Sequence, residues 1–402
     1  MHERRRGSGP LRGIRVLELS AVVAGPTAAQ VMGDLGADVI KVEPPSGDPV
    51  RMVGASKGEV PLWWKHLGRN KRSIGIDLSQ PAGRSVLLQL VDKSDVLIES
   101  FRPGTLERWD LAPAELLQRN PDLVVARISG FGREGPLAEK PAFGTLIEAI
   151  SGFASINGAA DGPPTLPPVA LADYLTGYAA VIAVLAALNA RNAGHARGQV
   201  VEVNLLRSLS SIMNLQILQV DQLGVRPRRV GSRMTTTAPR NVYETADGRW
   251  IAVSGTTLRT AATLMELAGH PEMTAAPWFG TGAGRFAHAD ELDGAMREWI
   301  GDKTMAEVLA EAERAGATLA PVNDVAELLA DPAVRGSGVV CEVSDPDLGD
   351  VLVPDVICDM SATPGAVEWL GEGLGSSTEE IIGELSLAAD EVLALRQKGV
   401  IV

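Results

Sequence analysis

Residues 14–43 read IRVLELSAVVAGPTAAQVMGDLGADVIKVE and contain one complete strand–helix–strand unit. Residues 14–19 and 38–43 are short apolar runs of strand-forming residues, and residues 26–35 between them have the spacing of a helix that Gly36 ends. A helix between two neighbouring strands returns the chain to the same edge of the sheet, so the strands run parallel. This stretch predicts an α/β fold with a parallel sheet.

The same alternation continues along the first half of the chain. Further predicted strands are residues 73–78, 95–99, 123–129 and 199–204, and predicted helices are residues 81–93, 172–190 and 205 to about 223. Such continuous apolar strands, separated by helices, are typical of βαβ units with both sheet faces covered. The helix at 172–190 is apolar on nearly every face, which indicates a buried helix.

A polar, arginine- and threonine-rich connector then interrupts this pattern. Beyond it, residues 241–243 and 250–254 flank Asp247-Gly248, a strong hairpin signal, and helical patterns follow at 258–268, 295–300 and 305–315. Two more helices are predicted at 378–385 and 390–398. We divide the chain into a large α/β domain at 1–223, a linker at 224–240, a small α+β domain at 241–335 and a return segment at 336–402.

Composition excludes several classes of function. The 402 residues are 45% apolar and 22% charged, as in a soluble globular protein. The net charge of −13 gives no general attraction for nucleic acid or anionic membranes, so an anionic ligand requires a local basic patch. The longest apolar run, at 178–188, is too short to span a membrane. With Cys341 and Cys358 as the only cysteines and no signal peptide, we expect a cytoplasmic protein.

Two motifs match known signatures by letter but lack the required context. GFGREG at 130–135 fits the dinucleotide fingerprint, yet Pro136 follows at once and no helix begins there. GASKG at 54–58 fits the hydrolase nucleophile elbow, yet no strand precedes it and no helix follows. The five histidines show no metal-ligand spacing, so we expect no metal site and read each histidine as a surface residue.

Asp173 stands at the start of the apolar helix, in VALADYLTG at 169–177. A structural interpretation is that it caps the helix, since aspartate satisfies free amides there. A functional interpretation is that a carboxylate held beside Gly177 attacks an activated acyl group. The residues alone leave both interpretations open.

Long, ordered motifs resemble the family III CoA-transferases, the CaiB/BaiF type, over residues 11–402. They are LRGIRVLEL (11–19), AGP (24–26), LGADVIKVE (35–43), NKRSI (70–74), ESFRPG (99–104), GFG with GP (130–136), the Asp173 segment, SATPG (361–365) and LRQKGV (395–400). The resemblance implies an open parallel sheet completed by the return segment, a smaller inserted domain and an interlocked homodimer.

The resemblance also implies a site and a mechanism. Asp173 would carry out catalysis by forming a mixed anhydride and then an aspartyl-CoA thioester, as a carboxylate nucleophile allows. Backbone amides near Val23, Ala24 and Gly25 would stabilise oxyanions. Coenzyme A or acyl-CoA would be a substrate rather than a bound cofactor, and a carboxylic acid would accept CoA. Residues that match the CoA-contacting stretches are Ile76, Asp77, Leu78, Ser79, Ser100, Phe101, Arg102 and Arg108, although Arg102 and Arg108 could equally be solvated surface charges.

Departures from the family pattern lie in the segment 141–150. Acyl-CoA racemases of the same superfamily are the second hypothesis, but they carry a histidine where Phe143 stands, and without it a second proton shuttle is missing. A CoA-ester hydrolase ranks third and a non-catalytic binding module fourth. The usual carboxylate is replaced by Gly144 and the usual glutamine by Glu148, one helical turn apart. We expect Glu148 to border the site and Gly144 to leave room for a larger acyl group; the alternative is that Glu148 is a solvated charge. The loop at 231–237 lacks the glycine-rich pattern of several members.

Overall fold

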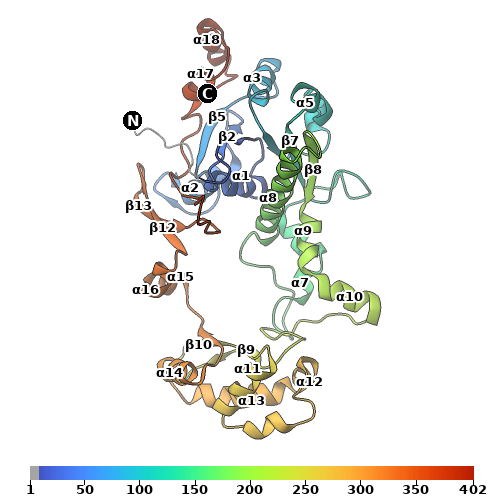
Figure 1. Cartoon of the computed structure of the whole chain (residues 1–402), viewed down its shortest axis with the longest axis vertical. Helices are drawn as coiled ribbons and strands as arrows, with labels where there is room; N and C mark the ends of the chain where they lie inside the picture. The colour runs from blue at the N-terminus through green and yellow to red at the C-terminus, as the bar shows by residue number, and fades with distance from the viewer. Residues whose placement is uncertain (1–8) are drawn as a thin grey trace. The chain divides into compact units, whose positions relative to one another are not determined.

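The structure is a computed structural model that describes residues 9–402, and the chain divides into two compact units. A six-stranded, all-parallel sheet forms the centre of the first unit (Figure 1). Every pair of neighbours in the sheet runs parallel. The strands, in spatial order, are β5 (Lys71–Gly75), β2 (Asp38–Glu43), β1 (Arg15–Glu18), β6 (Val96–Glu99), β7 (Val124–Ser129) and β8 (Gln199–Asn204). The order reverses between β1 and β6, and ligands of open α/β sheets bind at the carboxyl ends of strands at such a point. The predicted α/β class with a parallel sheet is confirmed.

Helices cover both faces of this sheet. On one face, α1 (Ala24–Asp34) packs against α8 (Leu171–Asn192), and α8 also contacts β7 and β8. The other face carries an apolar cluster that includes Leu17, Ile40 and Ile74. Helices contributing to that cluster are α3 (Pro81–Val91), α5 (Pro113–Arg119), α17 (Thr378–Gly383) and α18 (Ala389–Gln397).

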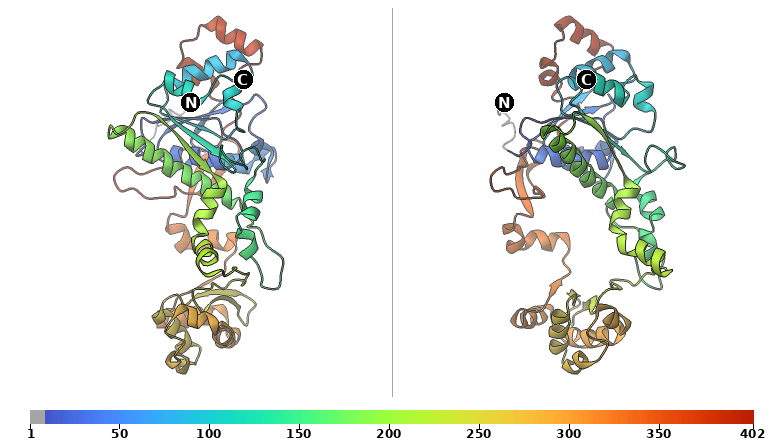
Figure 2. Two further views of the ribbon diagram at one scale, coloured as in Figure 1. Left: turned by 90° about the vertical axis from the view of Figure 1, so that its right-hand side faces the viewer. Right: turned by 45° about the vertical axis from the view of Figure 1, so that its right-hand side comes forward.

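Helix α8 has the length and composition to cross a membrane, and among residues 9–402 no other helix passes that test. It nevertheless packs against protein, running beside β8 in both views of Figure 2. Its Gly177 allows a close approach to α1, because a Cβ there would lie 2.8 Å from the Ala24 carbonyl oxygen and from Thr27. Only eight of the 22 residues of α8 are buried, and Ile182 is 70% exposed, so α8 packs against α1 and the sheet along one side and the predicted burial on nearly every face is not observed.

The C-terminal segment belongs to the first unit. Residues Gly338–Val402 cluster with the described residues up to Ser151 and with Pro167–Leu215. The amide of Val402 donates to the carbonyl of Gly75 at 3.1 Å, and Ile401 forms a bridge with Ile76 beyond the end of β5. Other elements of this unit are η1 (Pro49–Met52), β3 (Ser56–Lys57), β4 (Val60–Pro61), α2 (Leu62–Leu67), α4 (Thr105–Arg108), α6 (Gly144–Ile150), α9 (Leu205–Ile212), β12 (Val340–Asp345) and β13 (Gly349–Pro354).

The second unit consists of Gly152–Leu166 and Gln216–Ser337, so the residues expected as a linker, 224–240, lie within it. Its antiparallel sheet holds β9 (Arg240–Glu244), β10 (Trp250–Ser254) and β11 (Leu319–Pro321), with Gly248 at a φ of +73° in the hairpin turn. Its helical elements are α7 (Phe153–Ile156), α11 (Leu258–Leu267), η2 (Pro271–Ala275), α12 (Gly282–Ala287), α13 (Ala289–Gly301), α14 (Met305–Ala315), α15 (Val325–Ala330) and α16 (Pro332–Gly336).

Two predicted elements differ from the structure in instructive ways. Strand β5 begins at Lys71 rather than at residue 73, because Lys71 and Arg72 are buried by ion pairing although they look like exposed polar residues. The helix predicted at 205 to about 223 is two helices, α9 and α10 (Asn214–Leu223), with Met213 between them. The periodicity of apolar residues predicts neither the ion pairs of a buried charged residue nor the break between α9 and α10.

Candidate active site

Asp173 occupies the first turn of α8, three residues after the N-cap Ala170. It is therefore not the cap that one interpretation of the sequence assigned to it. Apart from its own backbone, its carboxylate has no hydrogen-bond or ion-pair partner among the residues that the structure describes. Burial, and then the negative charge of Glu148, raise the pKa of Asp173 to about 6. The result is a partly buried carboxylate with raised basicity and no cation beside it.

Glu148 lies on α6, which packs against α8. Its side chain is only 3% exposed, and Oε1 accepts a hydrogen bond of 3.2 Å from the amide of Ala172, the residue before Asp173. Glu148 is thus a buried neighbour of Asp173 rather than a solvated helix charge.

Gly144, the first residue of α6, also lies next to Asp173. A Cβ at position 144 would lie 2.1 Å from Asp173 Oδ2. The expectation that Gly144 leaves room for a larger acyl group stays a prediction, because this distance concerns the carboxylate of Asp173 and not an acyl group. The neighbouring Phe143 side chain is 67% exposed and carries no ionisable group.

The start of α1 lies against the start of α8. Val23, the N-cap of α1, belongs to a small apolar cluster into which Ala170 and Tyr174 pack. No described residue accepts a hydrogen bond from the amides of Ala24 and Gly25, as is usual in a first helical turn. These amides are therefore free to donate a hydrogen bond, and they follow the carboxyl end of β1, beside which the strand order reverses.

A buried ion network fixes the segment that leads into α1, and the sequence analysis missed it. Lys41 Nζ contacts Glu18 at 2.9 Å, Asp48 at 2.7 Å and the Ser20 carbonyl at 2.5 Å. Lys71 Nζ contacts Glu18 at 2.7 Å and the Pro26 carbonyl at 2.8 Å. Burial alone would lower the pKa of Lys41, but Glu18 and Asp48 raise it above its usual value. The available signal was the presence of charged residues within predicted apolar strands, Glu18 in residues 14–19 and Lys41 in residues 38–43.

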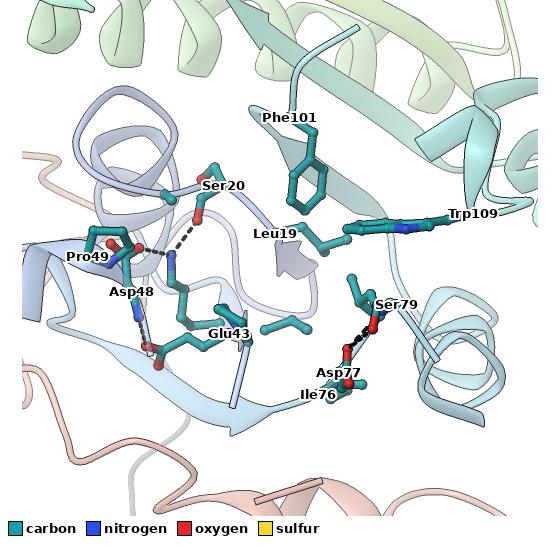
Figure 3. Close-up of a pocket in the computed structure, with 15 residues that line it drawn as sticks. Leu19, Ser20, Glu43, Asp48, Pro49, Ile76, Asp77, Ser79, Phe101 and Trp109 are labelled. Carbon is teal, nitrogen blue, oxygen red and sulfur yellow. Dashed lines mark hydrogen bonds and ion pairs between the residues drawn. The ribbon is translucent and has the colours of Figure 1, made fainter. Parts of the chain in front are cut away.

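A pocket with a volume of about 330 Å³ opens at the carboxyl ends of β1, β2 and β5 (Figure 3). Phe101 and Trp109, whose ring centroids are 5.3 Å apart in an edge-to-face arrangement, form one wall. Five of the predicted CoA-contacting residues line it, namely Ile76, Asp77, Leu78, Ser79 and Phe101. Residues that line it without having been predicted are Leu19, Ser20, Ala21, Lys41, Val42, Glu43, Pro44, Asp48, Pro49 and Trp109.

The remaining predicted CoA residues flank this wall. Ser100 Oγ accepts from the Ala21 amide at 3.1 Å, which ties the two strand ends together. Arg102 and Arg108 are both exposed, and neither forms an ion pair with any residue in the range 9–402; Arg108 only contacts Thr105 Oγ1 at 2.9 Å. Arg102 and Arg108 are therefore exposed positive charges next in sequence to Phe101 and Trp109, although neither lines the pocket.

The discarded motifs and the histidines have structural explanations. No helix begins after residues 130–135 until α6, and residues 54–58 lie in an exposed β3–β4 hairpin. His66 differs from expectation, because it is partly buried in α2, and burial lowers its pKa to about 4. In the described part of the chain, no group of three or more His, Cys, Asp or Glu side chains is arranged to hold a metal ion.

Comparison with known proteins agrees with this architecture. The profile of CoA-transferase family III matches residues 11–377. The chain is 38% identical over 396 residues to the succinyl-CoA–D-citramalate CoA-transferase of Chloroflexus aurantiacus, with 98% of each chain covered. It is 34% identical over 390 residues to the succinate–glutarate CoA-transferase of Agrobacterium fabrum, with 94% and 96% covered.

Solved structures give the same assignment. The crystal structure of a CAIB/BAIF family protein from Brucella suis superposes with a TM-score of 0.81 at 31% identity, covering 94% of this chain and 100% of that one. The family resemblance found in the sequence is therefore confirmed. The chain belongs to CoA-transferase family III, and it is an enzyme of the CoA-transferase class.

Proposed function

We propose that this enzyme moves CoA from an acyl-CoA donor to a small dicarboxylic acid, with Asp173 as the covalent nucleophile. The observation that carries the proposal is the isolated, partly buried carboxylate of Asp173 at the start of α8, with its pKa raised to about 6. A carboxylate of raised basicity that remains ionised at neutral pH suits attack on a thioester. Succinyl-CoA is the donor we select, because relatives in Chloroflexus aurantiacus are named for transfer from succinyl-CoA to citramalate and to malate.

The reaction follows from the chemistry of a carboxylate. Asp173 attacks the thioester carbonyl, the C–S bond breaks and CoA thiolate leaves, which gives a mixed anhydride. The thiolate then attacks the aspartyl carbonyl, so that the donor carboxylate departs and an aspartyl-CoA thioester remains. The acceptor carboxylate attacks this thioester, releasing thiolate again, and thiolate finally attacks the acceptor acyl carbon of the second anhydride. Asp173 returns as a free carboxylate, and no other reactant is needed.

Each addition places negative charge on a carbonyl oxygen. The amides of Ala24 and Gly25 have no acceptor in the described chain, and the cluster of Val23 with Ala170 and Tyr174 holds the start of α1 against the start of α8. Preorganised backbone amides of this kind stabilise oxyanions without reorganisation cost at the moment of reaction. We assign the oxyanion-stabilising role to these two donors.

We assign the adenine end of CoA to the pocket beside Phe101 and Trp109. An aromatic wall, apolar Leu19 and Leu78 and polar Ser79 suit a purine ring, and the unpaired Arg102 and Arg108 suit phosphate groups. Membership of the family also supports a homodimer, which sedimentation of the purified protein would test, and a cytoplasmic location, which cell fractionation would test.

The racemase alternative receives less support from the site. Racemisation at an α-carbon needs a second proton shuttle, and the position where a histidine would stand holds the exposed Phe143. The named relatives quoted above are transferases.

An acceptor screen with trapping tests the proposal. Succinyl-CoA and acetyl-CoA are offered as donors with a panel of mono- and dicarboxylic acids, and products are read by mass spectrometry. Incubation with donor followed by hydroxylamine should modify the peptide that contains Asp173, and Asp173→Ala should remain folded but inactive. Near-normal turnover by Asp173→Ala would overturn the proposal.

A further inference from the structure

We propose that Glu148 is a positioning residue for the nucleophile: it caps α8 from the neighbouring helix, and its negative charge favours the acylated form of Asp173 over the free carboxylate. This inference rests on the proposed nucleophilic role of Asp173. It adds a second carboxylate to the site and gives that carboxylate two separable tasks.

The capping task follows from the geometry of the helix start. The first four amides of a helix have no partner within it, and a polar side chain at the N-cap usually accepts from one of them. Here the N-cap is Ala170, which has no acceptor. Glu148 Oε1, 3.2 Å from the amide of Ala172, replaces it from α6. The acceptor therefore comes from 24 residues away and fixes the backbone directly before Asp173.

The electrostatic task follows from the isolation of the pair. Glu148 is 3% exposed, and no lysine, arginine or histidine in the described chain forms an ion pair with it or with Asp173. Two carboxylates close together in a site poor in water repel each other, because the effective dielectric constant is low. Within residues 9–402, Glu148 is the one ionisable side chain whose charge raises the pKa of Asp173.

The other ionisable groups near α8 form ion pairs with other residues, are exposed to solvent or lie away from Asp173 along their helix or strand. On the elements packed against α8 they are Asp34 on α1, Arg127 on β7, Glu202 on β8 and Arg207 on α9, and α8 itself carries Tyr174, Tyr178 and Arg191. Asp34 pairs with Arg69, Arg127 pairs with Glu99 and Glu107, and Arg191 pairs with Asp95. None of them acts on the charge of Asp173.

The consequence concerns the covalent intermediates. Acylation converts Asp173 from an anion into a neutral anhydride or thioester, as protonation converts it into a neutral acid. Both changes remove the repulsion from Glu148. The interaction that makes Asp173 a stronger base therefore also lowers the free energy of the acylated enzyme relative to the free enzyme.

Glu148→Gln separates the two tasks, because glutamine keeps the oxygen that accepts from Ala172 but removes the charge. We expect the acid limb of the pH dependence of kcat/KM to move to lower pH by roughly one pH unit. The amount of aspartyl-CoA thioester trapped at steady state should fall roughly threefold or more. Thermal stability should be unchanged or raised. Glu148→Ala should move the acid limb in the same direction and, in addition, lower the melting temperature, because the cap is lost.

Glu202→Gln is the matched control, since it removes a carboxylate from β8 that does not act on Asp173. It should leave both the pH profile and the trapped amount as in the wild type. A Glu148→Gln variant with the wild-type acid limb and the wild-type amount of trapped thioester would overturn the inference.

A readout that does not depend on turnover distinguishes this inference from the proposed function. The titration of the Asp173 carboxyl carbon, followed by carbon-13 NMR in the free enzyme, should shift to lower pH in Glu148→Gln even if Asp173 formed no adduct. Failure to trap any adduct in the wild type would instead refute the nucleophilic role. An unshifted NMR titration would refute the role of Glu148 alone.

Discussion

Oδ2 of Asp173 lies 2.1 Å from the position that a Cβ would take at Gly144. The two residues belong to α8 and α6, and the missing side chain of the one makes the space for the carboxylate of the other. An exposed aspartate side chain could rotate away at little cost, but that of Asp173 is partly buried and lies near the charge of Glu148. Position 144 therefore constrains where the carboxylate of Asp173 lies.

Gly144→Ala should displace the carboxylate of Asp173 and lower kcat by at least about tenfold, since small misplacements of a reacting group are costly. Gly383→Ala is the control, because Gly383 is also helical and a Cβ there meets no atom within 4 Å. The control should keep full activity and gain about 0.5–1 kcal/mol of stability. Steady-state kinetics and thermal unfolding measure both. Full activity of Gly144→Ala would show that the carboxylate has another position to occupy.

Asp173→Asn should stabilise the protein at neutral pH while abolishing transfer. Burial and Glu148 raise the pKa of Asp173 from 3.8 to about 6, so the folded state binds this proton more tightly than the unfolded chain does. The contribution of the Asp173 carboxyl group to the free energy of unfolding is therefore fully present below about pH 4 and is lost as the pH rises through about 6. Asparagine is neutral throughout, so the variant should exceed the wild type by about 1–2 kcal/mol above pH 6 and by almost nothing at pH 4. Denaturant unfolding at several pH values measures this difference, and a constant difference at all pH values would contradict the prediction.

Arg102→Ala and Arg108→Ala should each weaken CoA binding by about tenfold or more, which corresponds to the loss of a charge-assisted contact of about 1.5–3 kcal/mol. Added salt should weaken binding by the wild type as well, because the contacts are exposed. Arg197→Ala removes an exposed arginine that pairs with Asp122 and should leave the affinity unchanged. Calorimetric titration with CoA gives the dissociation constants. Unchanged affinity in both variants would make Arg102 and Arg108 ordinary surface charges.

The wild-type enzyme should not invert the configuration of the α-carbon of a 2-methylacyl-CoA. The physical reason is that inversion needs a base on one side of the α-carbon and a proton donor on the other, and Phe143 can be neither. Chiral chromatography of the thioester recovered after incubation of one enantiomer measures the configuration. Formation of the other enantiomer at a rate comparable to CoA transfer would support the racemase alternative.

Local sequence patterns determined much of this fold. Continuous apolar strands and intervening helices determined the parallel sheet, and β2 and β8 have the predicted bounds. The motif around Asp173 placed a carboxylate at the start of an apolar helix. These features depend on residues close together in the chain, where the periodicity of burial is visible directly.

Tertiary structure decided which side chains meet at the site. The spacing of Gly144 and Glu148 puts them on one face of α6, but only the packing of α6 against α8 makes Asp173 their shared neighbour. The burial of Lys41 and Lys71 likewise depends on Glu18, which stands on a different strand. Hydrogen bonds and charge pairs between distant residues have no period in the sequence. The sequence therefore predicted Asp173 as the candidate nucleophile, while the packing of α6 against α8 determined its surroundings.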